Sequence, residues 1–202
     1  MTARKTQEST ARPRPAVVIR SIRPADAAGL QAFHARLSND TIRNRFLGVH
    51  PILRDTEAHG FTSVLRGKDA ALVATVDEVI VAVGRYVGLS GADAEVAFVV
   101  EDPYQGHGIA TALLTLLAHS AWDDGVRRLV ADTFATNRAM LDVFMHTPRA
   151  VTVLNTRRDG SVVHVVMAVV PPNSLLATAV EAPRPAQHCH AKVVVGSAEV
   201  SR

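Results

Sequence analysis

The sequence predicts an α/β fold in which one mixed, mostly antiparallel sheet carries helices on both faces. Valine-rich apolar runs of strand length alternate with segments whose apolar residues recur at helical spacing. Their order along the chain is one strand, two helices, three strands, a helix, a strand, a helix and two strands. Such an order gives a helix-and-sheet sandwich around one core.

The length of the chain indicates a single domain. It has 202 residues, of which 48% are hydrophobic, enough for one well-buried core and short for two. We expect the domain to span residues 17–171. Residues 1–16 have almost nothing to bury, so we expect a disordered basic segment there. The tail 172–202 is expected to be weakly ordered, although 192–195 could pair with a sheet edge.

The positive charge of the chain lies at its ends. The net charge is +3, yet residues 21–171 contain 14 Lys and Arg against 16 Asp and Glu. A basic balance of this origin does not indicate a nucleic-acid groove, so we expect no nucleic-acid partner.

Cysteine content and hydropathy indicate a reducing compartment. The chain has one cysteine, Cys189, and so forms no internal disulfide. It has no run of 18 apolar residues and no apolar segment behind the charged N-terminus. We expect a cytoplasmic protein without membrane contact. His188, Cys189 and His190 are fewer ligands than a structural zinc site needs, so we expect no metal.

The first part of the domain is a strand followed by helices. The strand covers 17–22, and Asp26 is a plausible N-cap of the helix that follows. Ser38 begins a second helix, and 50–67 is expected to be a helix and loop at the substrate entrance. In the first helix, four residues recur at helical spacing: Leu30, Phe33, His34 and Leu37.

The second part of the domain is mostly strands. Asp77 and Glu78 separate two valine-rich runs and predict a hairpin, and Asp159-Gly160 predicts a second one. The expected elements are strands 70–76, 79–87 and 93–100, a helix over 109–122, a strand over 128–134, a helix from Asn137 that stops at Pro148, and strands 151–155 and 161–170.

The turn after the strand 93–100 has the outline of an anion site. Gly106 and Gly108 let the backbone approach a ligand without a Cβ in the way. The first free N–H groups of the following helix point outward, where the positive end of the helix dipole lies. We expect a phosphate or pyrophosphate to bind there.

Two other phosphate-binding loops were compared with this turn. A Walker loop ends in Gly-Lys-Ser/Thr, whereas Gly108 is followed by Ile109-Ala110, so that class is excluded. A dinucleotide-binding fingerprint needs a Gly or Ala where Thr111 stands. Asp132 lies at a tolerable distance for a ribose carboxylate, so this alternative stays open.

The spacing Gln105-x-x-Gly108-x-Ala110 resembles the acyl-CoA signature of the GNAT family of N-acetyltransferases, written Gln/Arg-x-x-Gly-x-Gly/Ala. The resemblance covers about residues 18–170. Ile22-Arg23-Pro24, Arg36-Leu37-Ser38 and a helix with Arg43 and Phe46 are similar to the opening of bacterial protein-lysine acetyltransferase domains. The order of strands and helices is also the order found in this family.

The resemblance implies acetyl-CoA as the cosubstrate, with no metal, and a primary amine as the acceptor, a protein lysine first. The main chain would hold the pyrophosphate and the pantetheine arm, and the N–H of Val99 or Phe98 would polarise the thioester carbonyl. The implied CoA-binding residues are Phe98, Val99, Val100, Gln105, Gly106, His107, Gly108, Ile109, Ala110, Thr111 and Asn137. Read without the family, Asn137 is a helix N-cap.

Glu95 is the candidate general base. It lies in an otherwise apolar strand, and by alternation it points away from the face of Val96, Phe98 and Val100. We expect its apolar neighbours to shield it, which would make it hold a proton more tightly than in water. An ammonium acceptor must lose a proton before it attacks, and Glu95 resembles the catalytic glutamate of the lysine acetyltransferases.

One departure from the family concerns the leaving thiolate. Many relatives carry a tyrosine as general acid in or after the last helix, whereas 141–146 contains none. The thiolate would then leave unassisted, or water or His146 would serve. The alternatives to protein-lysine acetylation are acetylation of a small amine and a non-catalytic CoA-binding sensor. Arg43 and Arg45 are expected on a solvated helix face.

Overall fold

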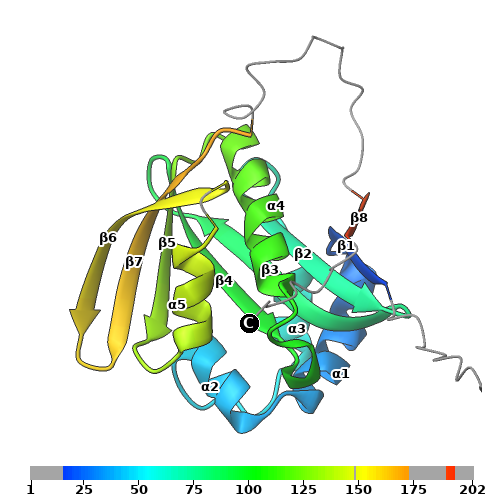
Figure 1. Cartoon of the computed structure of the whole chain (residues 1–202). Coiled ribbons are helices and arrows are strands. Elements are labelled where there is room, and N and C mark those ends of the chain that lie inside the picture. The colour runs from blue at the N-terminus through cyan, green and yellow to red at the C-terminus, as the bar shows by residue number, and fades with distance from the viewer. Residues whose placement is uncertain (1–15, 148, 173–189, 194–202) are drawn as a thin grey trace, which may run out of the picture.

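The valine-rich segments form one eight-stranded sheet in the order β6-β7-β5-β4-β3-β2-β1-β8 (Figure 1). The computed structural model describes residues 16–147, 149–172 and 190–193. The strands are β1 (Val17–Ser21), β2 (Asp69–Val76), β3 (Val79–Gly88), β4 (Asp93–Val100), β5 (Arg128–Phe134), β6 (Val151–Asp159), β7 (Val162–Val169) and β8 (His190–Val193). Every neighbouring pair is antiparallel except β4 and β5, so the predicted mixed sheet is confirmed.

Five α-helices cover this sheet, and two short 3-10 turns, Pro24–Asp26 and Asp102–Tyr104, join elements. Ser38 caps its helix as predicted, because its hydroxyl accepts the Thr41 N–H at 3.2 Å. Asp26 stands at the predicted cap position, but its carboxylate accepts hydrogen bonds from Arg20 and Arg23 instead. The helices are α1 (Ala27–Arg36), α2 (Asn39–Phe46), α3 (Asp55–Thr62), α4 (Ile109–Asp123) and α5 (Arg138–Met145).

The two faces of the sheet bury separate hydrophobic clusters. α4 and α5 cover the face seen in Figure 1, where Phe98 and other alternate residues of β4 meet Leu113 and Leu117. The opposite face packs against α1, α2 and α3 around Leu30 and Phe33. The alternation predicted for β4 is therefore confirmed, with the side chains of residues 94, 96, 98 and 100 buried.

The two predicted hairpins form at their predicted turn residues. Asp77 and Glu78 both have positive φ, 47° and 64°, which is the conformation that a tight two-residue hairpin requires. β6 continues to Asp159, beyond the predicted end at Asn155, after a register shift between Val153 and Asn155. A bulge lets a strand continue past an irregularity that breaks its apolar alternation.

β4 and β5 pair over only part of their length. Three residue pairs join them, Asp93 with Arg128, Ala94 with Leu129 and Glu95 with Val130. Beyond Glu95, β4 keeps its partner β3 up to Val100 but has none on its other edge. This divergence opens the sheet on one side of the glycine turn.

Some of the expectations lie outside the described residues. These are the disorder of residues 1–15, most of the tail, Pro148, and two members of the histidine and cysteine cluster, His188 and Cys189. Within the tail, β8 pairs antiparallel with β1; it shares residues 192 and 193 with the segment 192–195 that was expected to pair with a sheet edge, and residues 194 and 195 lie outside the described residues.

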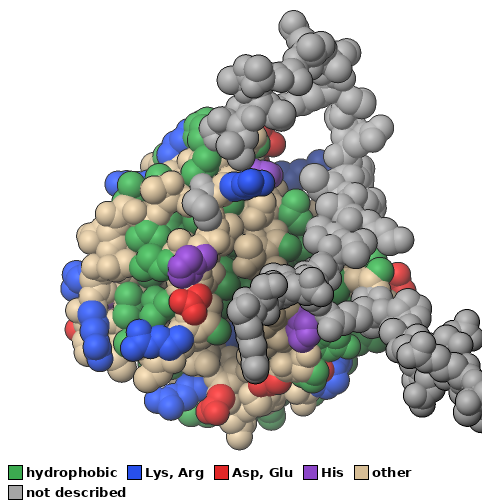
Figure 2. Space-filling view, viewed as in Figure 1, with side chains coloured by type: hydrophobic (Ala, Val, Ile, Leu, Met, Phe, Trp, Pro, Cys, Tyr) green, Lys and Arg blue, Asp and Glu red, His purple; other side chains and the backbone are tan. Residues whose placement is uncertain are grey.

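The surface gives no sign of a basic groove on the face drawn in Figure 2. The Lys and Arg side chains of the described residues are scattered over that face among polar and apolar groups. The longest described helix, α4, has 15 residues, and none of the described helices is long and apolar enough to be a membrane span.

Candidate active site

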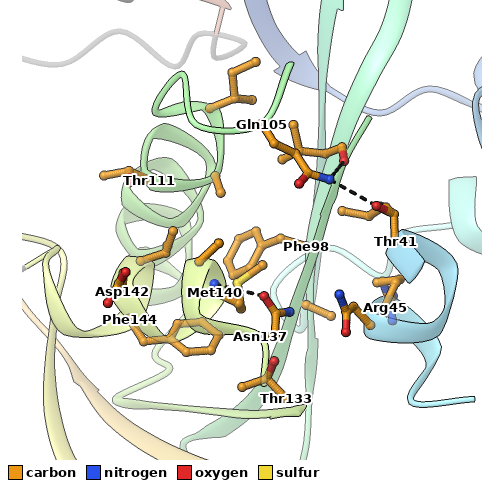
Figure 3. A pocket seen from close by; sticks show the side chains of 18 of the residues that line it. Thr41, Arg45, Phe98, Gln105, Thr111, Thr133, Asn137, Met140, Asp142 and Phe144 are labelled. Atoms are coloured by element: carbon orange, nitrogen blue, oxygen red, sulfur yellow. Dashed lines mark hydrogen bonds between the residues drawn. The ribbon is translucent and has the colours of Figure 1, made fainter. Parts of the chain in front are cut away.

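A cleft of about 370 Å³ lies where β4 and β5 diverge. Its walls come from residues 96–100 of β4, from the glycine turn, from Asp132 and Thr133 of β5, and from α5. Arg45 and Thr41 of α2 close it on the other side of the sheet (Figure 3). The residues that line the cleft include both the predicted phosphate site in the glycine turn and the part of β4 that directly follows Glu95.

The glycine turn presents free amides at one end of this cleft. Gly106 and Gly108 have φ of 73° and 76°, a region that favours glycine. The first hydrogen bond of α4 runs from Ala112 N–H to the Gly108 carbonyl, at 3.0 Å. The N–H groups of Ile109, Ala110 and Thr111 therefore have no partner inside the helix and can bind an anion.

The main chain of β4 offers further groups to the cleft. Glu101 N–H donates to Val81 of β3 at 2.9 Å, and the Ala92 carbonyl accepts from Arg128 of β5 at 3.1 Å. Backbone groups alternate sides along a strand, and the register with β3 has no shift from Ala94 to Val100. Even-numbered residues thus face the side of β5, which directs the N–H of Phe98, and not that of Val99, into the open edge.

Gln105 and His107 lie differently from each other. The Gln105 side chain donates to the Val100 carbonyl at 3.0 Å and to Thr41 Oγ1 at 3.1 Å, so it ties the turn to β4 and α2 (Figure 3). The His107 ring is exposed, with Nδ1 2.7 Å from the Gln105 carbonyl, and it is absent from the cleft wall. The Gln105 N–H donates to the Asp102 carbonyl at 3.2 Å, whereas the backbone N–H of His107 has no hydrogen-bond partner among the described residues and is available to a phosphate.

Asn137 lies in the cleft wall and caps α5 at the same time. Its Oδ1 accepts the Met140 N–H at 3.2 Å, which leaves its side-chain NH₂ free to face the cleft (Figure 3). Nearby, the Thr133 hydroxyl is buried and has no hydrogen-bond partner among the described residues. Thr133 is not among the site residues predicted from the sequence; the signal that could have identified it is a hydroxyl on the buried face of a core strand.

An ionic clamp, formed by Arg36, Ser38 and Thr41 with Glu101 and Asp102, joins the helices to the end of β4. The Arg36 guanidinium donates twice to Glu101, at 2.9 Å each. Ser38 and Thr41 donate to Asp102 at 2.6 and 2.9 Å. The clamp holds α1 and α2 against the glycine turn and so fixes the width of the cleft.

The carboxylate of Asp102 couples this clamp to pH. Burial by itself would raise the pKa of Asp102, but hydrogen bonds from Ser38 and Thr41 bring that pKa below the ordinary value of 3.8. A group whose pKa is lower in the folded state stabilises the fold at neutral pH. That contribution is lost as the pH falls from about 4 through the folded value.

Asp102→Asn should therefore melt at a lower temperature than the wild type at pH 7, because the amide accepts weaker hydrogen bonds than the carboxylate. The gap in melting temperature should shrink as the pH falls from 5 to 3. Thermal unfolding followed by circular dichroism over this range measures it. A gap that stays constant with pH would contradict the assigned role of the ionised group.

Glu95 directly precedes the part of β4 that lines the cleft; it is exposed and is not itself part of the cleft wall. The expectation that apolar neighbours shield it is wrong, because its side chain stands on the β4 face where the sheet meets α2 and solvent. It is two residues before Ala97, which lines the cleft, so the two Cα atoms are about 7 Å apart along the strand. Its charge acts on Arg45 and on Arg85 of β3.

Arg43 and Arg45 have different surroundings despite their spacing in α2. Arg43 is exposed, as expected, with its guanidinium 5.1 Å from the centre of the Phe134 ring. Arg45 is partly buried, and the expectation of a solvated face is wrong for it. It lies in the wall of the cleft because α2 packs across the divergence of β4 and β5.

α5 brings no tyrosine to the cleft. Its residues there include Met140, Asp142, Val143 and Phe144. His146 is absent from the wall, and its Nδ1 lies 3.0 Å from the Asp142 carbonyl. The structure therefore does not bring His146 together with the other predicted site residues.

The comparisons with known proteins agree with this geometry. The model of the acetyltransferase (GNAT) family matches residues 37–146, more than half of the chain. The chain belongs to the GNAT family. Its resemblance to that family is thus confirmed, and it is an N-acetyltransferase that uses acetyl-CoA.

Solved GNAT structures have the same fold. The GNAT domain of PAT from S. lividans is 31% identical, with a TM-score of 0.68 over 75% of this chain and 89% of that one. A GNAT acetyltransferase from Streptococcus pneumoniae is 18% identical, with a TM-score of 0.62 over 76% and 99%. The yncA protein from Salmonella typhimurium, solved with its cofactor acetyl-CoA, is 18% identical, with a TM-score of 0.55 over 80% and 97%. Among curated proteins, no sequence gives a significant match.

Membership of the GNAT family decides between the phosphate loops. The dinucleotide-binding alternative, with Asp132 as a ribose ligand, is wrong. Asp132 does line the cleft, but its Oδ1 lies 2.6 Å from Nδ1 of His164, a residue of the adjacent strand β7. The sheet also differs from a doubly wound one, since β4 and β5 are its single parallel pair among the described strands.

Proposed function

We propose that the protein transfers the acetyl group of acetyl-CoA to a primary amine, with Glu95 as the general base and a protein lysine as the acceptor. The observation that carries the proposal is that one cleft has free backbone N–H groups at both of its ends, in the glycine turn with the first turn of α4 and at Phe98 of β4. Donors in this order match the order of the pyrophosphate, the pantetheine amides and the thioester along one molecule.

The glycine turn and the first turn of α4 would hold the pyrophosphate. The contributing amides belong to Gly106, His107 and Gly108, followed by Ile109, Ala110 and Thr111. The pantetheine arm would run along the open edge of β4 beside Phe98 and Val100, with Asn137 on the opposite wall. Val99 and Gln105 support this edge: Val99 through its pairing with Val83, and Gln105 through its bond to the Val100 carbonyl.

The chemistry follows from these positions. Glu95 takes a proton from the ammonium of the acceptor, directly or through one water, and the neutral nitrogen attacks the thioester carbon. The Phe98 N–H stabilises the negative charge that develops on the carbonyl oxygen. The carbon–sulfur bond breaks, the nitrogen loses its second proton to solvent as the amide forms, and the thiolate of CoA takes up a proton from solvent. Positioning and a base suffice for a leaving group as acidic as a thiol.

The acceptor class rests on two kinds of support. The likeness to the S. lividans PAT domain, at 31% identity over most of both chains, supports a protein lysine. A small amine is the second candidate, because α1, α2 and α3 enclose a cavity of about 50 Å³ on the acceptor side of β4. The proposal places the enzyme in the cytoplasm, in keeping with its single cysteine.

Release of free CoA thiol tests the proposal. Purified protein is given acetyl-CoA with lysine peptides, polyamines or amino acids, and the thiol is followed with a chromogenic disulfide. We expect release that depends on the amine and a product heavier by one acetyl group in mass spectrometry. Binding of CoA without release for every amine offered would overturn the proposed transfer.

A further inference from the structure

The cavity on the acceptor side of β4 has an unusual lining for its size. Most of its wall is apolar, from the cluster under α1 and α3, and two guanidinium groups and one imidazole complete it. The polar members are Arg45, Arg85 and His34. Arg45 and Val99 also line the acetyl-CoA cleft, so the two spaces share a wall at β4.

The two arginines carry positive charge and have no close counterion among the described residues. Neither forms an ion pair within 4.0 Å with any described residue. The Arg85 Nε is buried and has no hydrogen-bond partner among those residues. The Arg85 guanidinium lies 5.3 Å from the centre of the Phe61 ring, and that of Arg45 lies 5.1 Å from the Phe46 ring. Aromatic faces compensate only part of the cost of burying a cation.

The pKa shifts of Arg45 and Arg85 also agree with two cations that lack a close counterion. Burial lowers the pKa of Arg45, and the neighbouring charge of Arg85 lowers it further. Burial also lowers the pKa of Arg85, against the opposing effect of Asp69 and Glu95. Two like charges that are partly dehydrated and near each other form a site that an entering anion would stabilise.

His34 adds a hydrogen-bonding group to the same wall without adding charge. It is 4% exposed, and its Nε2 has no partner among the described residues. Burial lowers the pKa of His34, as does the charge of His50, so the ring is neutral at pH 7. The cavity therefore contains unsatisfied polar atoms of two side chains, His34 and Arg85, that point to a polar ligand group.

We propose that this cavity is an anion subsite of the acceptor, which holds a carboxylate a few bonds away from the amine that is acetylated. The charge of Glu95 acts on both arginines, and Glu95 directly precedes Val96, the first residue of β4 that lines the adjoining cleft. A molecule that pairs its ammonium with Glu95 and its carboxylate with Arg85 and Arg45 matches the site at both ends. The inference rests on the proposed function, since it assigns the acceptor of that reaction.

The size of the cavity limits this ligand. Its volume of about 50 Å³ corresponds to roughly three to five water positions, since each occupies about 10–15 Å³ on this measure. A carboxylate with two or three carbons fits, and a longer anion does not. The carboxylate can belong to a free amino acid or to an acidic side chain next to an acceptor lysine.

Paired acceptors separate these two sources. One pair is an amino acid and its primary amide, and the other is a lysine peptide with Glu or with Gln beside the lysine. We expect the carboxylate member of one pair to be acetylated with a kcat/KM about tenfold higher, as one charge-assisted hydrogen bond provides. The pair that responds identifies the source, and no preference in either pair would overturn the subsite.

Arg85→Met tests the cation itself, because methionine keeps the apolar stem and removes the guanidinium. This variant should lose the tenfold preference, while Arg43→Met on the exposed side of α2 should keep it. Arg85→Lys retains a charge without the Nε donor and should keep part of the preference; it serves if the methionine variant unfolds. An undiminished preference in folded Arg85→Met would overturn the assignment, and so would an undiminished preference in Arg85→Lys if the methionine variant unfolds.

Propionate provides a readout that needs no turnover. It should raise the melting temperature of the wild type but not of Arg85→Met, and propionamide should raise neither. If propionate stabilises the protein while no amine is acetylated, the transfer proposal fails and the subsite stands. If amines are acetylated without a carboxylate preference and propionate has no effect, the subsite fails alone.

Discussion

Glu95→Gln should lower kcat by about a hundredfold or more while leaving the affinity for acetyl-CoA within about twofold, because a positioned base contributes roughly 10²–10⁴-fold to such a step. Glutamine has the same shape but cannot accept the proton of an ammonium acceptor. The exposed side chain of Glu95 makes no hydrogen bond that the fold depends on, so the variant should melt with the wild type. Thiol release measures kcat, and calorimetric titration measures the affinity.

Glu78→Gln is the matched control. Glu78 is an exposed acid in the β2–β3 turn that does not line the cleft, and its variant should retain full activity. Normal turnover of Glu95→Gln would remove this residue from the mechanism and leave the transferase intact. Loss of acetyl-CoA affinity in that variant would instead mean that Glu95 shapes the cleft.

Thr111→Asp should weaken acetyl-CoA binding by roughly a hundredfold. Thr111 stands in the first turn of α4 and lines the cleft (Figure 3). Two like charges about 5–6 Å apart, at an effective dielectric constant of about 20, repel by about 3 kcal/mol. The same carboxylate near a helix N-terminus stabilises the helix by about 0.3–1 kcal/mol. Binding and thermal stability should therefore change in opposite directions.

Thr115→Asp adds the same charge one turn further along α4, outside the cleft wall. At the larger distance, and screened by solvent, it should change the affinity by less than about threefold. Calorimetric titration of both variants, together with their melting temperatures, checks the comparison. Equal losses of affinity in the two variants would mean that the pyrophosphate lies elsewhere on the helix.

The parts of the site that depend on neighbouring residues could be predicted from the sequence. Gly106 and Gly108 adopt positive φ directly before a helix, and the strand before them alternates buried and exposed residues as its sequence suggests. Asn137 caps α5 from the position where its residue type is favoured. Each of these features arises within a few residues, where conformational preference and side-chain chemistry act directly.

The parts that depend on distant contacts could not be predicted. Arg36 and Glu101 are 65 residues apart, and nothing local identifies them as partners. Arg45 is placed in two cavities because α2 crosses the divergence of β4 and β5, which a helical pattern does not reveal. Arg85 did carry a signal, since it is a charged residue inside a valine-rich strand, where a cation is costly without a reason. The sequence predicted that apolar neighbours shield the Glu95 side chain, but α2 is not positioned to cover it.

The short pairing of β4 with β5 affects how rigidly the two parts of the sheet are held together. Among the described strands, one part of the sheet is formed by β1, β2, β3 and β4 and another by β5, β6 and β7. The backbones of these two parts are joined through three residue pairs of β4 and β5. A molecule bound along the open edge would form hydrogen bonds with β4 and pack against the side of β5. It would therefore add a second connection between these two parts of the sheet. Loading with cosubstrate would then stiffen the halves of the protein against each other before any acceptor arrives.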